Sequence, residues 1–211
     1  MNKNRPVAKT YKLFINGAFP RSESGYTLPI RNTEGQLLAN ISKASRKDLR
    51  DSVRAARSAQ DPWASRTAYN RGQILYRIAE MMEARREEFI TVLESTGETH
   101  KEAVGQVEDA IERWVWYAGW ADKIHHVLGT VNPVAGPYFN FTMPEPTGVV
   151  GVVASEEPAL RGRVSRLAPI IVSGNTAVVV VDAEAGLAAV TLAEVLATSD
   201  LPGGVVNLLT G

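Results

Sequence analysis

Three apolar segments in the last third of the chain constrain its fold more than any other feature. GVVGVVA begins at Gly148, TAVVVV spans Thr176–Val181 and VVNLL spans Val205–Leu209. Uninterrupted apolar runs of this length are typical of strands that are covered on both faces. Segments of helical character, about Leu160–Ser173 and Leu187–Thr198, lie between them. The order predicts a parallel βαβαβ unit with right-handed crossovers, and therefore an α/β fold.

The first sixty residues are expected to add short strands and one helix. Strand character is found in Tyr11–Gly17, Tyr26–Asn32 and Leu37–Ala44. Ser45 then has the chemistry of a helix N-cap, with Asp48 as its acidic partner near the positive end of the dipole. The helix is predicted to continue to Ala59. Its buried face is expected to carry Leu49, Val53, Ala56 and Ala59.

Two longer helices are predicted next. The first runs from about Thr67 to Glu94 and ends before Gly97, and the second runs from about Lys101 to Ile124. Trp116 and Trp120 widen the apolar surface of the second helix beyond one stripe. They belong either to the core or to a subunit interface.

A proline-bounded segment, Val131–Pro146, separates these helices from the apolar strands. Its residues alternate in two sets, with Tyr138, Asn140 and Thr142 on one face and Phe139, Phe141 and Met143 on the other. The pattern predicts a strand with two unlike faces, which excludes the interior of a parallel sheet.

Composition excludes several classes of function. Lys+Arg and Asp+Glu are both 23, which gives no electrostatic footprint for nucleic acid or an anionic membrane. No apolar run approaches the roughly 20 residues of a spanning helix, and the polar start MNKNRPVAKT has no signal-peptide character, so a cytoplasmic location is expected. Cysteine is absent, which excludes disulfides and a thiolate nucleophile in these residues, and the three histidines lack metal-binding spacing.

A βαβαβ unit binds nucleotides beyond the carboxyl ends of its strands. Those ends are predicted at Val153–Ser155, Val180–Asp182 and Leu209–Gly211, and no G-x-G-x-x-G fingerprint follows the first strand. Asp182 and Glu184 follow the second strand, where a carboxylate either accepts a hydrogen bond from a ribose hydroxyl or caps a turn.

Charged residues follow the first strand. Glu156 and Glu157 would repel a pyrophosphate unless they turn away from it. Arg161, Arg163 and Arg166 in the next helix either offset that charge, contact a phosphate, or pair with the two glutamates on the helix surface.

Four segments in order give a family resemblance. YAGWADKI, YFNFTMPEPTGVVGVV, LAPIIVSGNTAVVV and LPGGVVNLLTG resemble the amino-terminal part of the NAD(P)-dependent aldehyde dehydrogenase superfamily, at matching spacing. The chain is similar to divergent actinobacterial-type members with an altered active site. The resemblance implies an aldehyde-dehydrogenase-like α/β fold, with amino-terminal helices and short strands packed on a partial Rossmann-like sheet.

The resemblance also implies how a cofactor would bind. The family holds NAD or NADP against the first strands without G-x-G-x-x-G. The implied cofactor-binding positions here are Val153, Ala154, Ser155, Glu156, Val180, Asp182 and Glu184. Two departures stand out. Glu157 replaces the family's oxyanion-donating Asn, where one lost donor costs on the order of 10²–10³ in rate. Val180 replaces a Lys that contacts the ribose.

The resemblance divides the chain into three parts. Residues 1–127 form the helical and strand part of the cofactor-binding domain, 128–147 an oligomerisation ribbon, and 148–211 the βαβαβ half of that domain. The catalytic domain, with the family's general-base Glu and nucleophilic Cys, is absent from these residues. The implied function is an amino-terminal portion of an aldehyde dehydrogenase that is not catalytic alone. The alternative is a truncated, non-catalytic scaffold that forms a homo-oligomer or pairs with a full-length relative.

Overall fold

The parallel sheet predicted from the apolar segments is present in a computed structural model of the chain, which describes residues 8–154 and 160–211. Its strands are β6 (Val149–Ala154), β7 (Thr176–Val181) and β8 (Val206–Thr210), in the order β6-β7-β8. Both pairings are parallel. The α/β prediction is confirmed.

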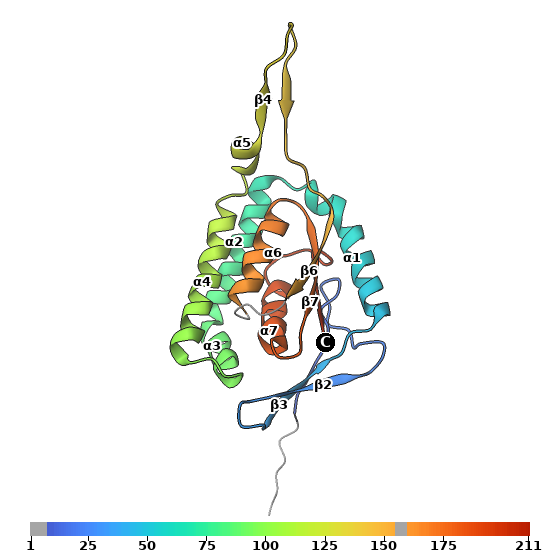
Figure 1. Cartoon of the computed structure of the whole chain (residues 1–211), viewed down its shortest axis with the longest axis vertical. Coiled ribbons are helices and arrows are strands. Elements are labelled where there is room, and N and C mark those ends of the chain that lie inside the picture. Colours follow the sequence, from blue (N-terminus) through green and yellow to red (C-terminus); the bar gives the residue numbers. More distant parts are fainter. Residues whose placement is uncertain (1–7, 155–159) are drawn as a thin grey trace, which may run out of the picture.

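Helices cover both faces of this sheet. The connecting helices α6 (Arg161–Val172) and α7 (Gly186–Ala197) pack on one face, and α1 (Arg46–Ala64) packs on the other (Figure 1). Ala56 of α1 joins a small cluster with Val178 of β7. The α6 and α7 face belongs to the main core. Coverage on both faces explains why the strands read as continuous apolar runs.

A third helical layer packs outside α6 and α7 (Figure 1). It consists of α2 (Ala68–Ala84), α3 (Arg86–Ser95) and α4 (His100–Ala118), and the short α5 (Ile124–Leu128) follows α4. The prediction of one continuous helix over Thr67–Glu94 is therefore wrong. The helix is divided into α2 and α3 at Arg85, whose φ of −111° and ψ of 19° are not helical.

Two further helix boundaries differ from the sequence prediction. The helix expected to reach Ile124 ends at Ala118. The first helix extends beyond Ala59 to Ala64, and Leu49 is exposed instead of buried. Asp48 takes the place of Leu49 on the inner face. It forms a capping box with Ser45, the predicted N-cap residue.

A second, mixed sheet lies at the end of the molecule opposite the hairpin of β4 (Thr130–Asn132) and β5 (Asn140–Thr142) (Figure 1). Its strands are β1 (Thr10–Tyr11), β3 (Leu37–Ser42) and β2 (Thr27–Arg31), in the order β1-β3-β2. The strand expected over Tyr11–Gly17 is thus mostly irregular. Phe14 instead forms an antiparallel bridge with Leu208, which covers the outer edge of β8.

The ribbon is an antiparallel hairpin of β4 (Thr130–Asn132) and β5 (Asn140–Thr142) that projects from the body (Figure 1). The exclusion of a parallel-sheet interior is therefore confirmed. Phe139 and Phe141 stack at 5.5 Å between ring centroids and both are exposed. Among the residues that the structure describes, no helix is long and apolar enough to cross a bilayer.

Candidate functional site

The candidate site lies at the carboxyl ends of the parallel strands. The register pairs Val153 of β6 with Val180 of β7, and Ala154 with Val181. Asp182 follows β7 directly. The structure therefore brings together four of the predicted cofactor-binding positions, namely Val153, Ala154, Val180 and Asp182. Parallel strands deliver their carboxyl ends to one edge, which is the physical reason for this convergence.

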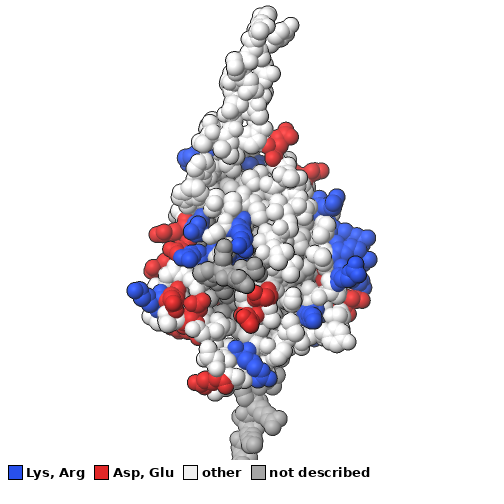
Figure 2. All heavy atoms as spheres, in the orientation of Figure 1, with Lys and Arg blue, Asp and Glu red and all other residues white. Residues whose placement is uncertain are grey.

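One face of this edge is uncovered. Val153 is 75% exposed and Val180 is half-buried. A Cβ added to Gly151 would meet no atom within 4 Å. These three residues are here called the strand patch. They lie on the sheet face that α1 covers nearer the amino ends of the strands. Figure 2 shows a broad area without charged side chains on the face where β6 lies. A flat apolar surface of this kind suits a planar ring, and no side chain of the patch can hydrogen-bond to a hydroxyl.

The two carboxylates beyond β7 differ in their contacts. Asp182 Oδ1 accepts a hydrogen bond from the Ala185 amide at 2.9 Å, so it caps the turn before α7. The turn-cap interpretation left open by the sequence is therefore the one that the contacts support. Glu184 is exposed and lines a cavity of about 260 Å³ with Arg31 and Thr96.

Three predicted positions, Ser155, Glu156 and Glu157, lie outside the described residues. Their roles remain predictions from the sequence. No group of three His, Cys, Asp or Glu side chains that could hold a metal ion occurs within 8–154 and 160–211.

The helix α4 positions the start of α6. Gln106 Oε1 accepts a hydrogen bond from the Leu160 amide at 3.3 Å. Arg161 forms an ion pair of 3.0 Å with Asp109. Arg161 therefore pairs with a carboxylate of α4, which is none of the partners considered for it from the sequence.

Arg163 is placed differently from its neighbours on α6. It is 4% exposed, and its Nε and Nη1 have no hydrogen-bond partner among the described residues. Burial lowers the pKa of Arg163 to about 10, while the nearby Asp182 carboxylate acts in the opposite direction. Of the alternatives that the sequence left open for Arg163, a position on the helix surface is therefore wrong. The spacing to Leu167 and Ile171, four and eight residues on, is the signal that places it on the buried stripe.

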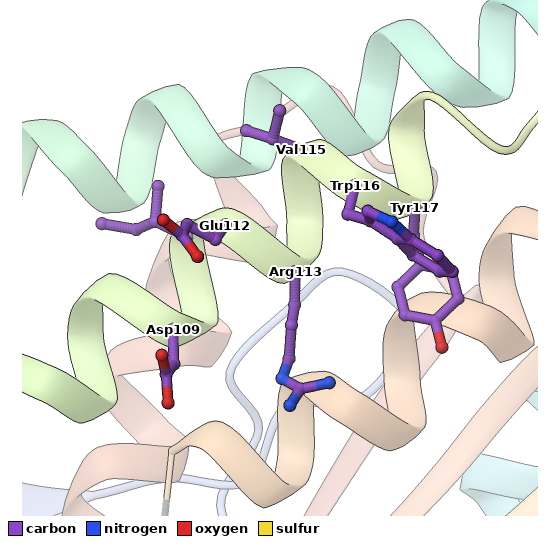
Figure 3. Close-up of a pocket in the computed structure, with 7 residues that line it drawn as sticks. Asp109, Glu112, Arg113, Val115, Trp116 and Tyr117 are labelled. Atoms are coloured by element: carbon purple, nitrogen blue, oxygen red, sulfur yellow. The ribbon is translucent and has the colours of Figure 1, made fainter.

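An open groove of about 640 Å³ runs along α4 near the start of α6 (Figure 3). Figure 3 shows Asp109 and Arg113 extending from the same side of the helix, with Trp116 and Tyr117 at its far end. Trp116 is 55% exposed, with its ring 4.7 Å from Tyr117 and 5.3 Å from Trp120. Because Trp116 is exposed, the prediction that it lies in the core is wrong. Trp120 is half-buried.

Comparisons of sequence support one family. A sequence model of the aldehyde dehydrogenase family matches residues 21–211. Retinal dehydrogenase 2 of Gallus gallus is 34% identical over 209 residues, which cover 96% of this chain and 40% of the relative. Benzaldehyde dehydrogenase of Antirrhinum majus is 32% identical over 213 residues, which cover 98% of this chain and 39% of the relative.

Comparisons of structure agree. An aldehyde dehydrogenase of Bacillus cereus, solved as an NAD+ complex, superposes with a TM-score of 0.91 at 30% identity, over 96% of this chain and 42% of that one. A salicylaldehyde dehydrogenase of Pseudomonas putida G7 superposes with a TM-score of 0.92 at 22% identity, over 97% and 42%, which supports the fold alone. The chain spans about two fifths of the length of these relatives. It belongs to the aldehyde dehydrogenase family.

Proposed function

We propose that the chain is the amino-terminal portion of the cofactor-binding domain of an aldehyde dehydrogenase. The observation that carries the proposal is the strand patch, an open apolar surface at the carboxyl ends of a parallel sheet in a chain of this family. On this proposal residues 1–147 and 148–211 act together, and the rest of the domain and the catalytic residues are supplied by the remainder of the enzyme, on the same polypeptide or on another.

The described residues fit one part of NAD or NADP better than another. Val153 and Val180 offer an apolar surface for a planar ring, which a dinucleotide supplies when it is bound. Val180 makes no hydrogen bond to a ribose, and one Asp182 oxygen already accepts from Ala185. The positions Ala154, Ser155, Glu156 and Glu184 complete the proposed cofactor-binding set. We therefore expect weak binding, with affinity that depends on ring contacts.

Calorimetric titration of NAD+ and NADP+ into the purified chain tests this site. Val153→Lys places a charge on the patch and is expected to abolish the heat of binding. Val180→Lys restores a cation at the position of the family's ribose-contacting Lys and is expected to tighten binding on the order of 10-fold, since a charged hydrogen bond contributes about 1.5–3 kcal/mol. Unchanged titrations for both variants would reject the strand patch as the cofactor surface.

Catalysis requires groups that this sequence does not contain. The chain has no cysteine, so it has no thiolate to attack an aldehyde. The proposal therefore assigns aldehyde oxidation to the complete assembly, in the cytoplasm. Immunoblotting of native extract tests whether this sequence is part of a longer enzyme, and immunoblotting of its soluble fraction tests the cytoplasmic location. A species well above 22.9 kDa that carries this sequence supports a longer enzyme. A 22.9 kDa species supports a separate subunit.

A second candidate function is a non-catalytic scaffold, favoured by the ribbon over residues 128–147. Phe139 is 76% exposed, and Phe141 and Met143 beside it are also exposed, which is unusual for a surface without a partner. On this proposal the ribbon joins copies of the chain, or this chain and a longer relative. Sedimentation should show a complex that dissociates with Phe139→Ser plus Phe141→Ser. Tyr26→Ser, at an exposed aromatic residue directly before β2, is the control.

A further inference from the structure

Among the described residues two arginines are buried, Arg71 and Arg163, and their hydrogen bonding differs. Arg71 donates hydrogen bonds to the carbonyl oxygens of Val172, Ala64 and Arg66. Arg163 is buried to the same degree, yet its Nε and Nη1 donate to nothing among the described residues. A buried guanidinium without an acceptor is strongly unfavourable, because both charge and donors lose water.

The guanidinium of Arg163 lies at the same edge of the sheet as the strand ends. Arg163 is the third residue of α6, and side chains on a helix lean toward its amino end. The Asp182 carboxylate, which follows β7, is close enough to influence Arg163 electrostatically but forms no hydrogen bond with it. The cation therefore lies between the amino end of α6 and the carboxyl end of β7.

The amino end of α6 adds a second attraction for an anion. The helix spans 12 residues, and among the described residues its N-cap residue, Leu160, makes no side-chain cap hydrogen bond. Its first amides and dipole favour negative charge. Asp109 pairs with Arg161 and so neutralises that neighbouring cation. Arg163 is left as the cation of this turn whose charge no described hydrogen bond balances.

We propose that Arg163 and the amino end of α6 form a binding site for a phosphate-type oxyanion. A tetrahedral oxyanion offers several acceptors at once, which matches two guanidinium nitrogens without a partner among the described residues, beside the first amides of the helix. The site lies on the α6 side of the sheet, whereas the strand patch lies on the α1 side. It therefore lies on the opposite face of the sheet from the strand patch, although Asp182 of the proposed cofactor-binding set is close to it. Titration of inorganic phosphate into Arg163 variants tests this site, whereas titration of NAD+ into Val153 variants tests the strand patch.

Calorimetry with inorganic phosphate, pyrophosphate, AMP and adenosine tests binding. We expect heat with the phosphate-bearing probes and none with adenosine. If AMP binds more tightly than phosphate, the ligand of the site is a nucleotide. If the two bind equally, the ligand is the free anion. Arg163→Met should weaken binding by on the order of 10- to 100-fold. The control is Arg161→Met. It removes a cation two residues away that already pairs with Asp109, and it should leave binding within about 2-fold of wild type.

The Tm in phosphate-free buffer distinguishes an anion-binding role of Arg163 from a structural role, because loss of a structural arginine would lower the Tm. If no group in the chain pairs with Arg163, Arg163→Met removes an uncompensated charge and leaves Tm equal or higher. Phosphate should then raise the Tm of wild type and not that of Arg163→Met. A large fall in Tm for Arg163→Met, reproduced by Glu157→Gln, would show that an internal carboxylate is the partner and would overturn the proposal, as would equal phosphate binding by both arginine variants.

Discussion

Asp48 is the residue whose removal the structure predicts most sharply. Its carboxylate accepts hydrogen bonds from the Ser22 hydroxyl at 2.7 Å, the Ser45 amide at 2.8 Å and the Glu23 amide at 3.2 Å. Asp48 is 6% exposed, so water does not replace these bonds. The residue thereby joins the start of α1 to the loop before β2.

The magnitude follows from these three bonds. Hydrogen bonds to charged groups contribute about 1.5–3 kcal/mol each and are not additive, and a helix cap contributes about 1 kcal/mol. Asp48→Ala is therefore expected to lower the free energy of unfolding by about 3–5 kcal/mol. Asp48→Asn keeps one acceptor oxygen and should cost about half as much. Asp51→Ala, on the same helix with exposed ion pairs only, should cost under about 0.5 kcal/mol.

The effect has a defined pH dependence. Burial favours the neutral acid, but the bonds from Ser45, Ser22 and Glu23 outweigh it and hold the pKa of Asp48 below its usual 3.8. A lowered pKa means that the charged form stabilises the fold above pH 3.8, and that this stabilisation is lost as the pH falls through the folded-state pKa. The difference between wild type and Asp48→Ala should therefore shrink below pH 3.8.

Urea denaturation followed by tryptophan fluorescence measures these differences, because Trp63 lies buried in the same helix. A loss below about 1 kcal/mol for Asp48→Ala at pH 7 would refute the stabilising role assigned to its three hydrogen bonds. A loss that stayed constant into acid would refute the assignment of the effect to the ionised carboxylate.

Three other outcomes are expected. Trp63→Phe removes the hydrogen bond from Nε1 to a main-chain oxygen of α6 and should cost about 2 kcal/mol in urea denaturation, against under about 0.5 kcal/mol for the exposed Trp116→Phe. Gly204→Ala puts a Cβ 2.6 Å from the Ala55 oxygen at a φ of +87° and should cost over about 2 kcal/mol, whereas Gly35→Ala, at +80° with no atom within 4 Å, should cost about 1 kcal/mol. The purified chain mixed with NAD+ and an aldehyde should produce no reduced cofactor, because it contains no cysteine; turnover above a buffer blank would contradict this.

The sequence predicted those parts of the fold that depend on local chemistry. The βαβαβ unit follows from apolar runs of strand length, and the Ser45 capping box from residues three apart. The break at Arg85 carries no Gly or Pro signal. It coincides with a contact of Arg85 to Glu194, 109 residues away on α7, which no local pattern reports.

The candidate site was predictable in position and less so in contacts. Strand ends fix where Val153, Val180 and Asp182 meet. Whether Asp182 faces a ligand or caps a turn depends on the Ala185 amide, and the burial of Arg163 depends on how α6 rotates against the sheet. Residue type alone left both open. The contact of Asp182 is set by tertiary packing, whereas the spacing of Arg163 to Leu167 is a sequence signal for its burial.

The bridge between Phe14 and Leu208 has a consequence for the order in which the chain can fold during synthesis. Asn16 also donates its amide to Asn207 Oδ1, and Thr210 Oγ1 donates to the Ser42 oxygen, so early residues depend on residues made almost two hundred positions later. Contacts of such separation require closure of a long loop and slow folding. The residues around Phe14 and Ser42 therefore lack these partners until β8 has left the ribosome, and a chaperone that shields apolar segments is most useful during that interval.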